Sequence, residues 1–339
     1  MKMKTRSFTG LSLESSQRCN LRCPLCVLRT YENYMKRCDM SPEVVRAVVP
    51  YLGGLETIDL TGWGEPLINP HLEDNLKLIR AGFSGILSFT TNGLLFNKKM
   101  MDSCIENEVD TICFSIDAVD EDCYSRMRPG GNFSRLMDNI KGLVMRRERA
   151  RAEKPELYAT YLLTRDNFDK AAEFVHLTSG LGMNGVLFQQ MTGVYSEEGR
   201  ALVTYTNYYQ TDFKEEILKD ALSRAKSAAP AGFHVAMPET IRSSRVKSCG
   251  GFDIQKPFIS ASGDVTLCCV MAYPVKMMSR DGRVTRRRQH FFGNVLKEPL
   301  PAIWASPEYV AVREELRGGG DPEECDDCIG LYIEKASEE

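Results

Sequence analysis

Residues 15–30 read SSQRCNLRCPLCVLRT and place Cys19, Cys23 and Cys26 in the spacing C-x3-C-x2-C. Three thiols this close in the chain indicate a shared metal site. A structural zinc ion takes four ligands, and the next Cys and the nearest His lie too far along the chain to complete a zinc site at the usual spacing. A [4Fe-4S] cluster also takes four ligands, so three protein thiolates leave one iron open to a small molecule.

Around this stretch, apolar strand-like runs alternate with amphipathic helical stretches up to about residue 192. Ser41 to Tyr51 is typical of the helical stretches, because Ser41 is a good cap and Pro42 suits a first turn. The alternation predicts an α/β fold, a partial (β/α)6 TIM-like barrel, with the cysteine triad at the carboxyl end of the first strand, where such barrels carry their chemistry. The six predicted strands are Gly10 to Ser16, Thr57 to Thr61, Ile86 to Thr91, Thr111 to Asp117, Leu157 to Thr164 and Val186 to Met191.

The composition of the chain argues against several classes of protein. The 339 residues carry 43 basic and 46 acidic side chains, a net charge of -3, which argues against a protein that binds nucleic acid. The sequence has neither the apolar run of a signal peptide nor a stretch of about 18 apolar residues, so we expect a cytoplasmic protein without a membrane partner. In a reducing compartment, twelve cysteines indicate metal ligands or catalytic thiols rather than a disulfide framework.

The triad after the first strand of a six-unit barrel resembles the radical S-adenosylmethionine (SAM) superfamily. The resemblance covers about residues 10–192, and one departure stands out, because Trp63 lies between two glycines where many members have glycine alone. Four further stretches, each after a predicted strand, are similar to motifs of that family: Thr61 to Pro66 (TGWGEP), Thr91 to Gly93 (TNG), Ser115 to Asp117 (SID) and Leu163 to Asn167 (LTRDN).

The resemblance implies a cofactor site. The open iron of a [4Fe-4S] cluster held by Cys19, Cys23 and Cys26 would chelate SAM, and the cluster's electron would cleave SAM to a 5'-deoxyadenosyl radical. A glycine-rich loop would hold the methionine amine, because a backbone without side chains can approach a ligand closely. The implied SAM contacts are Gly62, Trp63, Gly64, Glu65, Asn92, Ser115, Thr164, Asn167 and Gln190.

Asp117 is the first candidate catalytic residue. Side chains alternate along a strand, so Ser115 and Asp117 share a face, and Asp117 would lie at the mouth of the barrel. The alternative is that Asp117 caps a helix that begins near Asp120.

A second set of cysteines lies towards the carboxyl end of the sequence. Cys249, Cys268, Cys325 and Cys328 resemble the ligands of the auxiliary-cluster domain in the SPASM/twitch branch of the superfamily. Full SPASM domains continue with further cysteines, so the resemblance here implies one auxiliary [4Fe-4S] cluster, closed by four thiolates and suited to carry electrons. A four-thiolate zinc site is the alternative. Acidic neighbours of the CxxC pair argue against a redox-active disulfide, because they oppose a low thiol pKa.

Cys269 is the second candidate catalytic residue. It follows Cys268 in an extended segment, where neighbouring side chains point in opposite directions, so it is not expected to be a ligand. It is either a buried core thiol or a hydrogen-atom donor.

The organisation expected from these patterns has three parts. Residues 1–192 form the radical SAM barrel, residues 193–230 a connector with a helix from about Phe213 to Lys226, and residues 231–339 the auxiliary-cluster domain, with a helix from about Leu300 to Leu316. In the connector, Tyr205, Tyr208 and Tyr209 either line a substrate pocket or pack a domain junction. The arginine-rich stretch from Arg283 to Arg288 follows an Asp-Gly turn and is expected to be an exposed hairpin rather than a nucleic-acid patch.

The predicted function is a radical SAM oxidoreductase. The radical would abstract a hydrogen atom from a hydroxyl-bearing carbon of a sugar- or aminocyclitol-type small molecule, and the auxiliary cluster would accept the second electron, which resembles the single-cluster dehydrogenases of antibiotic pathways. A one-electron reductant such as flavodoxin or ferredoxin is the expected protein partner. The alternatives are an epimerase or a peptide-modifying enzyme and, from another class, a non-catalytic zinc or iron-sulfur protein. Only 18 residues precede Cys19, too few for a leader-peptide domain, which favours a small substrate.

Overall fold

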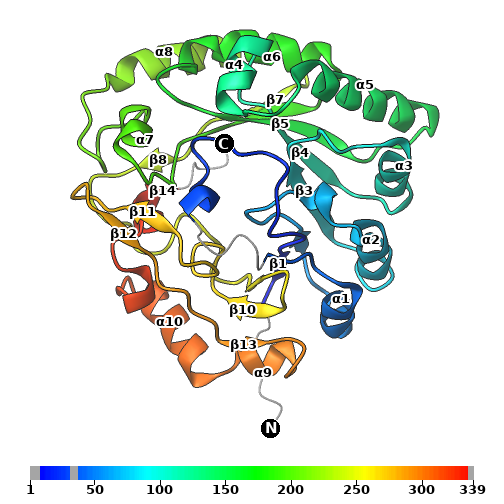
Figure 1. The fold of residues 1–339 in the computed structure, drawn as a ribbon, viewed down its shortest axis with the longest axis vertical. Coiled ribbons are helices and arrows are strands. Elements are labelled where there is room, and N and C mark those ends of the chain that lie inside the picture. The colour runs from blue at the N-terminus through cyan, green and yellow to red at the C-terminus, as the bar shows by residue number, and fades with distance from the viewer. Residues whose placement is uncertain (1–7, 31–36, 335–339) are drawn as a thin grey trace.

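A mostly parallel sheet forms the centre of the molecule. The computed structural model describes residues 8–30 and 37–334, and in this part of the chain ten strands make one sheet in the order β13-β10-β9-β1-β2-β3-β4-β5-β6-β7. The sheet curves around the middle of the molecule, and helices α1, α2, α3, α5, α6 and α8 lie along its outside (Figure 1). This arrangement confirms the predicted α/β fold.

The six predicted strands are all present and pair in parallel in sequence order. Most of their apolar side chains are buried, such as Ile112 and Phe114 of β4, as expected for strands covered on both faces. The strands are β1 (Gly10–Leu13), β2 (Thr57–Asp59), β3 (Ile86–Thr91), β4 (Thr111–Ser115), β5 (Glu156–Leu162) and β6 (Gly185–Gln189).

The crossover helices pack one apolar side on the sheet. In α5 the buried residues recur at helical spacing, so one stripe faces the core while arginines occupy the outside. The predicted helix from Ser41 to Tyr51 is present as α1 with a short 3-10 extension, η3 (Val49–Tyr51). The helices are α1 (Pro42–Val48), α2 (Leu72–Arg80), α3 (Lys98–Glu106), α4 (Glu121–Met127), α5 (Phe133–Arg149), α6 (Ala171–Gly180), α7 (Glu197–Ala201) and α8 (Glu215–Ser227).

The interval expected as a connector contributes to the barrel. Helix α8 packs beside α6, and the strand that follows it, β7 (His234–Ala236), pairs in parallel with β6. The strand, helix and strand alternation therefore continues for one more unit than predicted, past residue 192 and into the stretch assigned to the second domain. The physical reason is that α8 has its own apolar stripe, which is buried against the barrel. The predicted domain limits stay a prediction.

The C-terminal part of the chain extends the opposite edge of the same sheet. Strand β9 (Phe258–Ile259) pairs in parallel with β1, and two antiparallel strands follow, β10 (Asp264–Thr266) and β13 (Gly293–Asn294). The remaining strands form two small ribbons, β11 (Lys276–Met278) with β12 (Val284–Arg286), and β8 (Thr240–Ile241) with β14 (Ile333–Glu334).

One predicted helix is divided in two. The stretch from Leu300 to Leu316 forms α9 (Leu300–Trp304) and α10 (Pro307–Arg317). Ser306 is extended, and its side chain accepts a hydrogen bond from Tyr309 N at 3.4 Å, so it caps a new helix. The residue before a proline avoids helical geometry, which explains the break.

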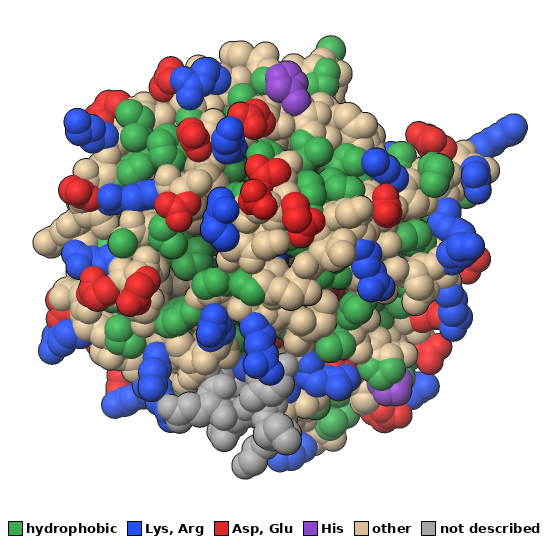
Figure 2. Space-filling view, turned by 45° about the horizontal axis from the view of Figure 1, so that its top comes forward, with side chains coloured by type: hydrophobic (Ala, Val, Ile, Leu, Met, Phe, Trp, Pro, Cys, Tyr) green, Lys and Arg blue, Asp and Glu red, His purple; other side chains and the backbone are tan. Residues whose placement is uncertain are grey.

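The surface carries charge of both signs. Figure 2 shows lysine, arginine, aspartate and glutamate side chains interspersed over one face, with apolar side chains between them. This mixture agrees with the net charge of -3. In the described part of the chain, no helix is both long and apolar enough to cross a membrane.

Candidate functional site: two cysteine clusters and the cavities between them

The cysteine triad lies between β1 and a short 3-10 helix, η1 (Val27–Thr30). The backbone fixes this loop, because Cys26 N donates to Cys23 O at 3.1 Å and Leu21 N donates to Cys19 Sγ at 3.4 Å. All three cysteines line one cavity of about 240 Å³, here called the cysteine-triad cavity. Their thiols interact electrostatically with one another, so the fold gathers them as the spacing predicts.

Burial is the main influence on the three thiols. Removal from water raises the pKa of Cys19 to about 12 and also raises the pKa of Cys23 and Cys26. Cysteines with raised pKa values are protonated at neutral pH, whereas a metal-bound cysteine is a thiolate. The site therefore suits a positively charged group such as a metal centre. Binding of that group to the three cysteines must release the thiol protons.

A half-buried arginine that the sequence did not indicate lies beside the triad. Arg128 Nη1 lies 3.9 Å from Cys23 Sγ, and the same guanidinium forms an ion pair with Asp117. Its charge opposes the effect of burial on the Cys23 pKa. Arg128 ends helix α4 and lies 105 residues from Cys23, so no local signal in the sequence connects the two.

Asp117 lines the cysteine-triad cavity, with its side chain engaged on two sides. One carboxylate oxygen accepts a hydrogen bond from Leu162 N at 2.8 Å, and the other pairs with Arg128. Its backbone is left-handed, with φ of 62°. The alternative role as a helix cap is wrong, because Asp120 itself caps α4 by accepting from Cys123 N at 2.7 Å. The catalytic role of Asp117 stays a prediction.

Glu65 ties the second and third loops of the barrel together. Its carboxylate accepts hydrogen bonds from Thr91 Oγ1 at 2.6 Å and from Asn92 N at 2.7 Å. The Asn92 side chain in turn donates to Asn20 Oδ1 at 2.9 Å, and its Nδ2 lies 3.9 Å from Cys19 Sγ. The loops after β1, β2 and β3 therefore form one hydrogen-bonded rim around the triad.

The two glycines of the second loop are needed for packing within the protein. A Cβ atom on Gly62 would clash with the side chain of Glu14, and one on Gly64 would clash with the carbonyl of Ser16. Both residues line the cysteine-triad cavity, where their missing side chains also leave room for a ligand. The structure thus adds a second reason for the glycines to the one expected from the sequence.

The other predicted SAM contacts fall in three places. Ser115 and Trp63 line the cysteine-triad cavity. Thr164 and Asn167 are fully buried behind its rim, where Asn167 accepts from Thr164 N at 2.8 Å and donates to the carbonyl of Asp117 at 3.2 Å. Gln190 lies on the second cavity described below. The contacts to SAM stay predictions, and for Thr164 and Asn167 the structure shows loop-shaping bonds.

The second set of cysteines also comes together. A Cβ atom on Gly330 would lie 3.2 Å from Cys249 Sγ and 3.5 Å from Cys328 Sγ, so this glycine leaves space between two thiols. Burial raises the pKa of Cys268 to about 12, and the neighbouring Cys328 and Cys249 thiols raise it further. The pKa of Cys325 is raised by the same causes. These four thiols fit a group that is enclosed by protein.

In neither cysteine set do the thiols lie close enough together to bind a single metal ion. Within residues 8–30 and 37–334, no group of three or more His, Cys, Asp or Glu side chains lies close enough to hold one metal ion. A [4Fe-4S] cluster distributes its cysteine ligands over several irons, so it does not require such convergence.

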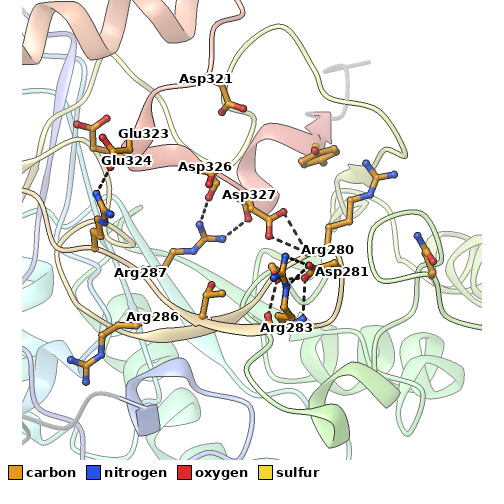
Figure 3. A pocket seen from close by; sticks show the side chains of 15 residues that line it. Arg280, Asp281, Arg283, Arg286, Arg287, Asp321, Glu323, Glu324, Asp326 and Asp327 are labelled. Carbon is orange, nitrogen blue, oxygen red and sulfur yellow. Dashed lines mark hydrogen bonds and ion pairs between the residues drawn. The ribbon is translucent and has the colours of Figure 1, made fainter.

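A clamp of hydrogen bonds holds the loop between Cys325 and Cys328 (Figure 3). Arg287, from the arginine-rich hairpin, donates to the carbonyls of Asp326 and Asp327, and Tyr208 Oη donates to the carbonyl of Asp327 at 3.0 Å. The predicted hairpin is confirmed by the pairing of β11 with β12. Its arginines do more than face solvent, because one of them reaches the cysteine loop.

The tyrosines of the expected connector pack the junction between the parts of the chain. Tyr205, Tyr208 and Tyr209 are all buried, and the hydroxyls of Tyr205 and Tyr209 donate to backbone carbonyls of Met191 and Met278. The packing interpretation is therefore correct, and these rings do not line the substrate pocket that was the alternative.

A second cavity, here called the junction cavity, adjoins the first. Its volume is about 350 Å³, and it is lined both by the barrel and by the C-terminal part of the chain. Cys269 lines it and Cys268 does not, which agrees with the expected alternation of these neighbours. Cys328 also lines it. The residues that it shares with the cysteine-triad cavity are Leu25, Cys26, Trp63 and Leu162.

Proteins of similar sequence include one named as cofactor-modifying and several named as cyclases. The "Tungsten-containing aldehyde ferredoxin oxidoreductase cofactor-modifying protein" of Pyrococcus furiosus is 25% identical over 332 residues, which cover 94% of this chain and 86% of that protein. A "GTP 3',8-cyclase" of Pelotomaculum thermopropionicum is 32% identical over 143 residues, which cover 40% of this chain and 42% of that protein.

Solved structures share the fold. Streptococcus suis SuiB bound to S-adenosylmethionine aligns with a TM-score of 0.63 at 15% identity, covering 96% of this chain and 72% of that one. Native anSMEcpe with bound AdoMet aligns with a TM-score of 0.64 at 15% identity, covering 95% and 87%.

Two family models match this chain. The "Radical SAM superfamily" model matches residues 13–175, and the "Iron-sulfur cluster-binding domain" model, SPASM, matches residues 249–329. The chain therefore belongs to the radical SAM superfamily, whose domain binds SAM and a [4Fe-4S] cluster, and it carries a SPASM domain, which binds auxiliary iron-sulfur clusters.

Proposed function

We propose that this enzyme oxidises a hydroxyl-bearing carbon of a small molecule, of the sugar or aminocyclitol type, to a ketone. One observation carries the proposal: the cysteine-triad cavity adjoins the junction cavity, and the junction cavity extends to Cys328. A substrate in the junction cavity would therefore lie between the site of SAM and the second set of cysteines.

The bound groups and the protein have different roles in the proposed reaction. When bound, SAM and its cluster supply the radical that removes one hydrogen atom from the substrate carbon, and the auxiliary cluster supplies the acceptor for the second electron. The proposed ligands are Cys19, Cys23 and Cys26 for the first cluster, and Cys249, Cys268, Cys325 and Cys328 for a single auxiliary cluster. The protein must orient the hydroxyl and accept its proton.

The polar residues of the junction cavity suit a hydroxylated substrate. Gln189, Gln190 and Thr192 line it from the end of β6, and Glu239 lines it from the stretch before β8. Amide and hydroxyl groups can orient several substrate hydroxyls through hydrogen bonds. The Glu239 carboxylate is the group that we propose as proton acceptor. Apolar neighbours such as Met277 line much of the rest of the cavity.

The size of the cavity favours a small molecule. Its volume of about 350 Å³ lies at the lower end of the range for drug-sized ligands. The names of the sequence relatives point the same way, because they state GTP and an enzyme cofactor as the molecules acted on. SuiB and anSMEcpe have also been solved with peptides, but they share only the fold with this chain.

The test is anaerobic reconstitution followed by assay of cleavage and oxidation. About eight irons per chain are expected for two clusters, and zinc without iron would exclude the proposal. Candidate polyols deuterated at the reacting carbon should transfer deuterium into 5'-deoxyadenosine and yield a ketone. Glu239→Gln should lower ketone formation, whereas Glu56→Gln, on the strand end opposite the cavities, should not. SAM cleavage without any deuterium transfer from a polyol would contradict the substrate class.

A second function, epimerisation, is favoured by one observation: Cys269 lines the junction cavity beside Trp63 and Cys328. A thiol at this position can give a hydrogen atom to a substrate radical, which would invert a carbon centre. The thiyl radical left on Cys269 would then have to take up one electron from the auxiliary cluster and one proton. Cys269→Ala separates the two functions. Loss of turnover with full iron content would favour epimerisation, and retained ketone formation would favour oxidation.

A further inference from the structure

Glu14 is a fully buried carboxylate between the two parts of the chain. It follows β1 directly and has no exposed surface. Its Oε1 accepts a hydrogen bond from Trp63 N at 3.2 Å, and its Oε2 accepts from Ala261 N at 3.4 Å and from the hydroxyl of Tyr273. One side of this carboxylate therefore contacts the glycine-rich loop, and the other contacts the C-terminal part of the chain.

The C-terminal segment from residue 259 to residue 273 also holds the loop directly. Trp63 Nε1 donates to the carbonyl of Cys269 at 2.9 Å. The backbone of Glu14 donates to the carbonyl of Ile259 at 2.9 Å, which continues the pairing of β1 with β9. The Trp63 backbone is thus bound through Glu14 while its ring is bound to the same C-terminal segment.

Close packing restricts the movement of the Gly62-Trp63-Gly64 loop. Gly62 lies against the Glu14 side chain so closely that a Cβ atom would clash with it. Trp63 lines both the cysteine-triad cavity and the junction cavity, so a shift of the loop would change the shape of both. Leaving a buried carboxylate without donors is costly, so the position of Glu14 depends on all the groups that donate to it, and these include the Gln17 side chain.

We infer that Glu14 is a positioning residue, through which the C-terminal segment 259–273 fixes the Gly62-Trp63-Gly64 loop and thereby sets the affinity for SAM. Glu14 does not itself line the cysteine-triad cavity, so its effect on SAM passes through the loop. The inference rests on membership of the superfamily and not on the proposed oxidation.

The experiment measures SAM binding in the reconstituted full chain by equilibrium dialysis at pH 8, where Glu14 is mostly ionised, without reductant or substrate. Glu14→Gln keeps the shape of the side chain but places a donor where an acceptor is needed, and it should weaken SAM binding about tenfold. Tyr273→Phe removes one hydroxyl from the C-terminal segment and should weaken SAM binding about threefold, although it lies outside the cysteine-triad cavity.

The matched control is Asp110→Asn, which removes a paired carboxylate charge at the opposite end of the barrel, where it binds Arg80 and Lys154. It is expected to lower the melting temperature without changing the dissociation constant for SAM. Iron content is measured for every variant, and if Glu14→Gln fails to retain iron, Tyr273→Phe decides the question.

A double variant tests whether the two residues act through one another. If they do, Glu14→Gln with Tyr273→Phe should bind SAM about as weakly as Glu14→Gln alone. Additive effects would mean that the two residues act separately and would overturn the inference. Dissociation constants within about twofold of the wild type for both single variants would overturn it as well.

Discussion

The two cysteine clusters differ in what surrounds their thiols. The triad of Cys19, Cys23 and Cys26 lines a cavity at the carboxyl end of the barrel strands. In the second set, Gly330 leaves space beside two of the thiols, and the loop from Cys325 to Cys328 is clamped by hydrogen bonds to its backbone. The first set opens onto a cavity of its own, whereas in the second set Cys268 and Cys325 are buried.

The difference indicates how one chain can hold two iron-sulfur clusters for two different purposes. With the proposed ligands, a missing fourth thiolate would leave the first cluster an open iron, and the loops around it would supply ligand contacts. A complete set of four would leave the second cluster no open position, and the clamp would keep the protein close around it. The junction cavity lies where the two meet, with Cys26 and Cys328 both on its wall.

The largest effect is expected when a ligand of one cluster is removed at a time. Cys23→Ala should leave about four irons per chain instead of eight and abolish 5'-deoxyadenosine formation, because the radical cannot form without the open iron. Cys249→Ala should also leave about four irons but retain some SAM cleavage. Iron analysis and product chromatography check both.

The control for this pair is Cys104→Ala, which removes a buried thiol of α3 that belongs to neither set. It should keep about eight irons. Equal loss of SAM cleavage in Cys23→Ala and Cys249→Ala would show that the two clusters do not have separate roles.

Next in size is the buried ion pair beside the triad. Arg128→Gln leaves Asp117 without its partner, and losing one member of a buried pair costs about 3 kcal/mol in the free energy of unfolding. Denaturant unfolding of the metal-free protein measures this cost. Adding Asp117→Asn should recover part of it, because the unpaired charge is then removed. If the single and double variants unfold alike, the pair does not contribute in this way.

The pH dependence of stability tests the carboxylate that lies between the two regions. Burial raises the pKa of Glu14 from its usual 4.5 to about 7, so the folded protein holds a proton that the unfolded chain releases. Stability from this group is complete below pH 4.5 and is lost as pH rises towards 7. From pH 6 to pH 8 the free energy of unfolding should fall by about 1 kcal/mol. The titratable groups around Glu14 are Tyr273, Cys38 and Cys269.

Glu14→Gln is the matched variant, because glutamine does not titrate. Its free energy of unfolding should change less than that of the wild type between pH 6 and pH 8. A parallel decline in both proteins would assign the pH dependence to other groups.

The smallest expected effect concerns the clamp on the closed cluster. Tyr208→Phe removes one hydrogen bond to the carbonyl of Asp327, which contributes about 1 kcal/mol. The auxiliary cluster should then lose iron to a chelator several-fold faster, while SAM cleavage is retained. Tyr205→Phe is the control, because its hydroxyl binds Met191 instead. Equal rates of iron loss in both variants would show that the clamp does not protect the cluster.

Local patterns predicted the barrel and both cysteine sets. The strands were readable because each is a short apolar run, and the triad was readable because its three cysteines lie within eight residues. The division of the last helix was missed at Ser306. Helix α8 lies in the stretch predicted as a connector and β7 in the stretch assigned to the second domain, although both continue the barrel. Such short elements are hard to place from the sequence, because their position depends on what they pack against.

By itself, the sequence determined the fold class and the superfamily, and it predicted the two sets of cysteines as cluster ligands, because these depend on residue type and spacing along the chain. Only the tertiary structure decided that Arg128 stands beside Cys23, that Glu14 joins the Trp63 loop to Tyr273, and that Arg287 and Tyr208 clamp the second cysteine loop. The physical reason is that these contacts join residues 39 to 259 positions apart. Residues this far apart belong to no common periodic pattern in the sequence. Whether they contact one another therefore depends on the packing of the whole sheet.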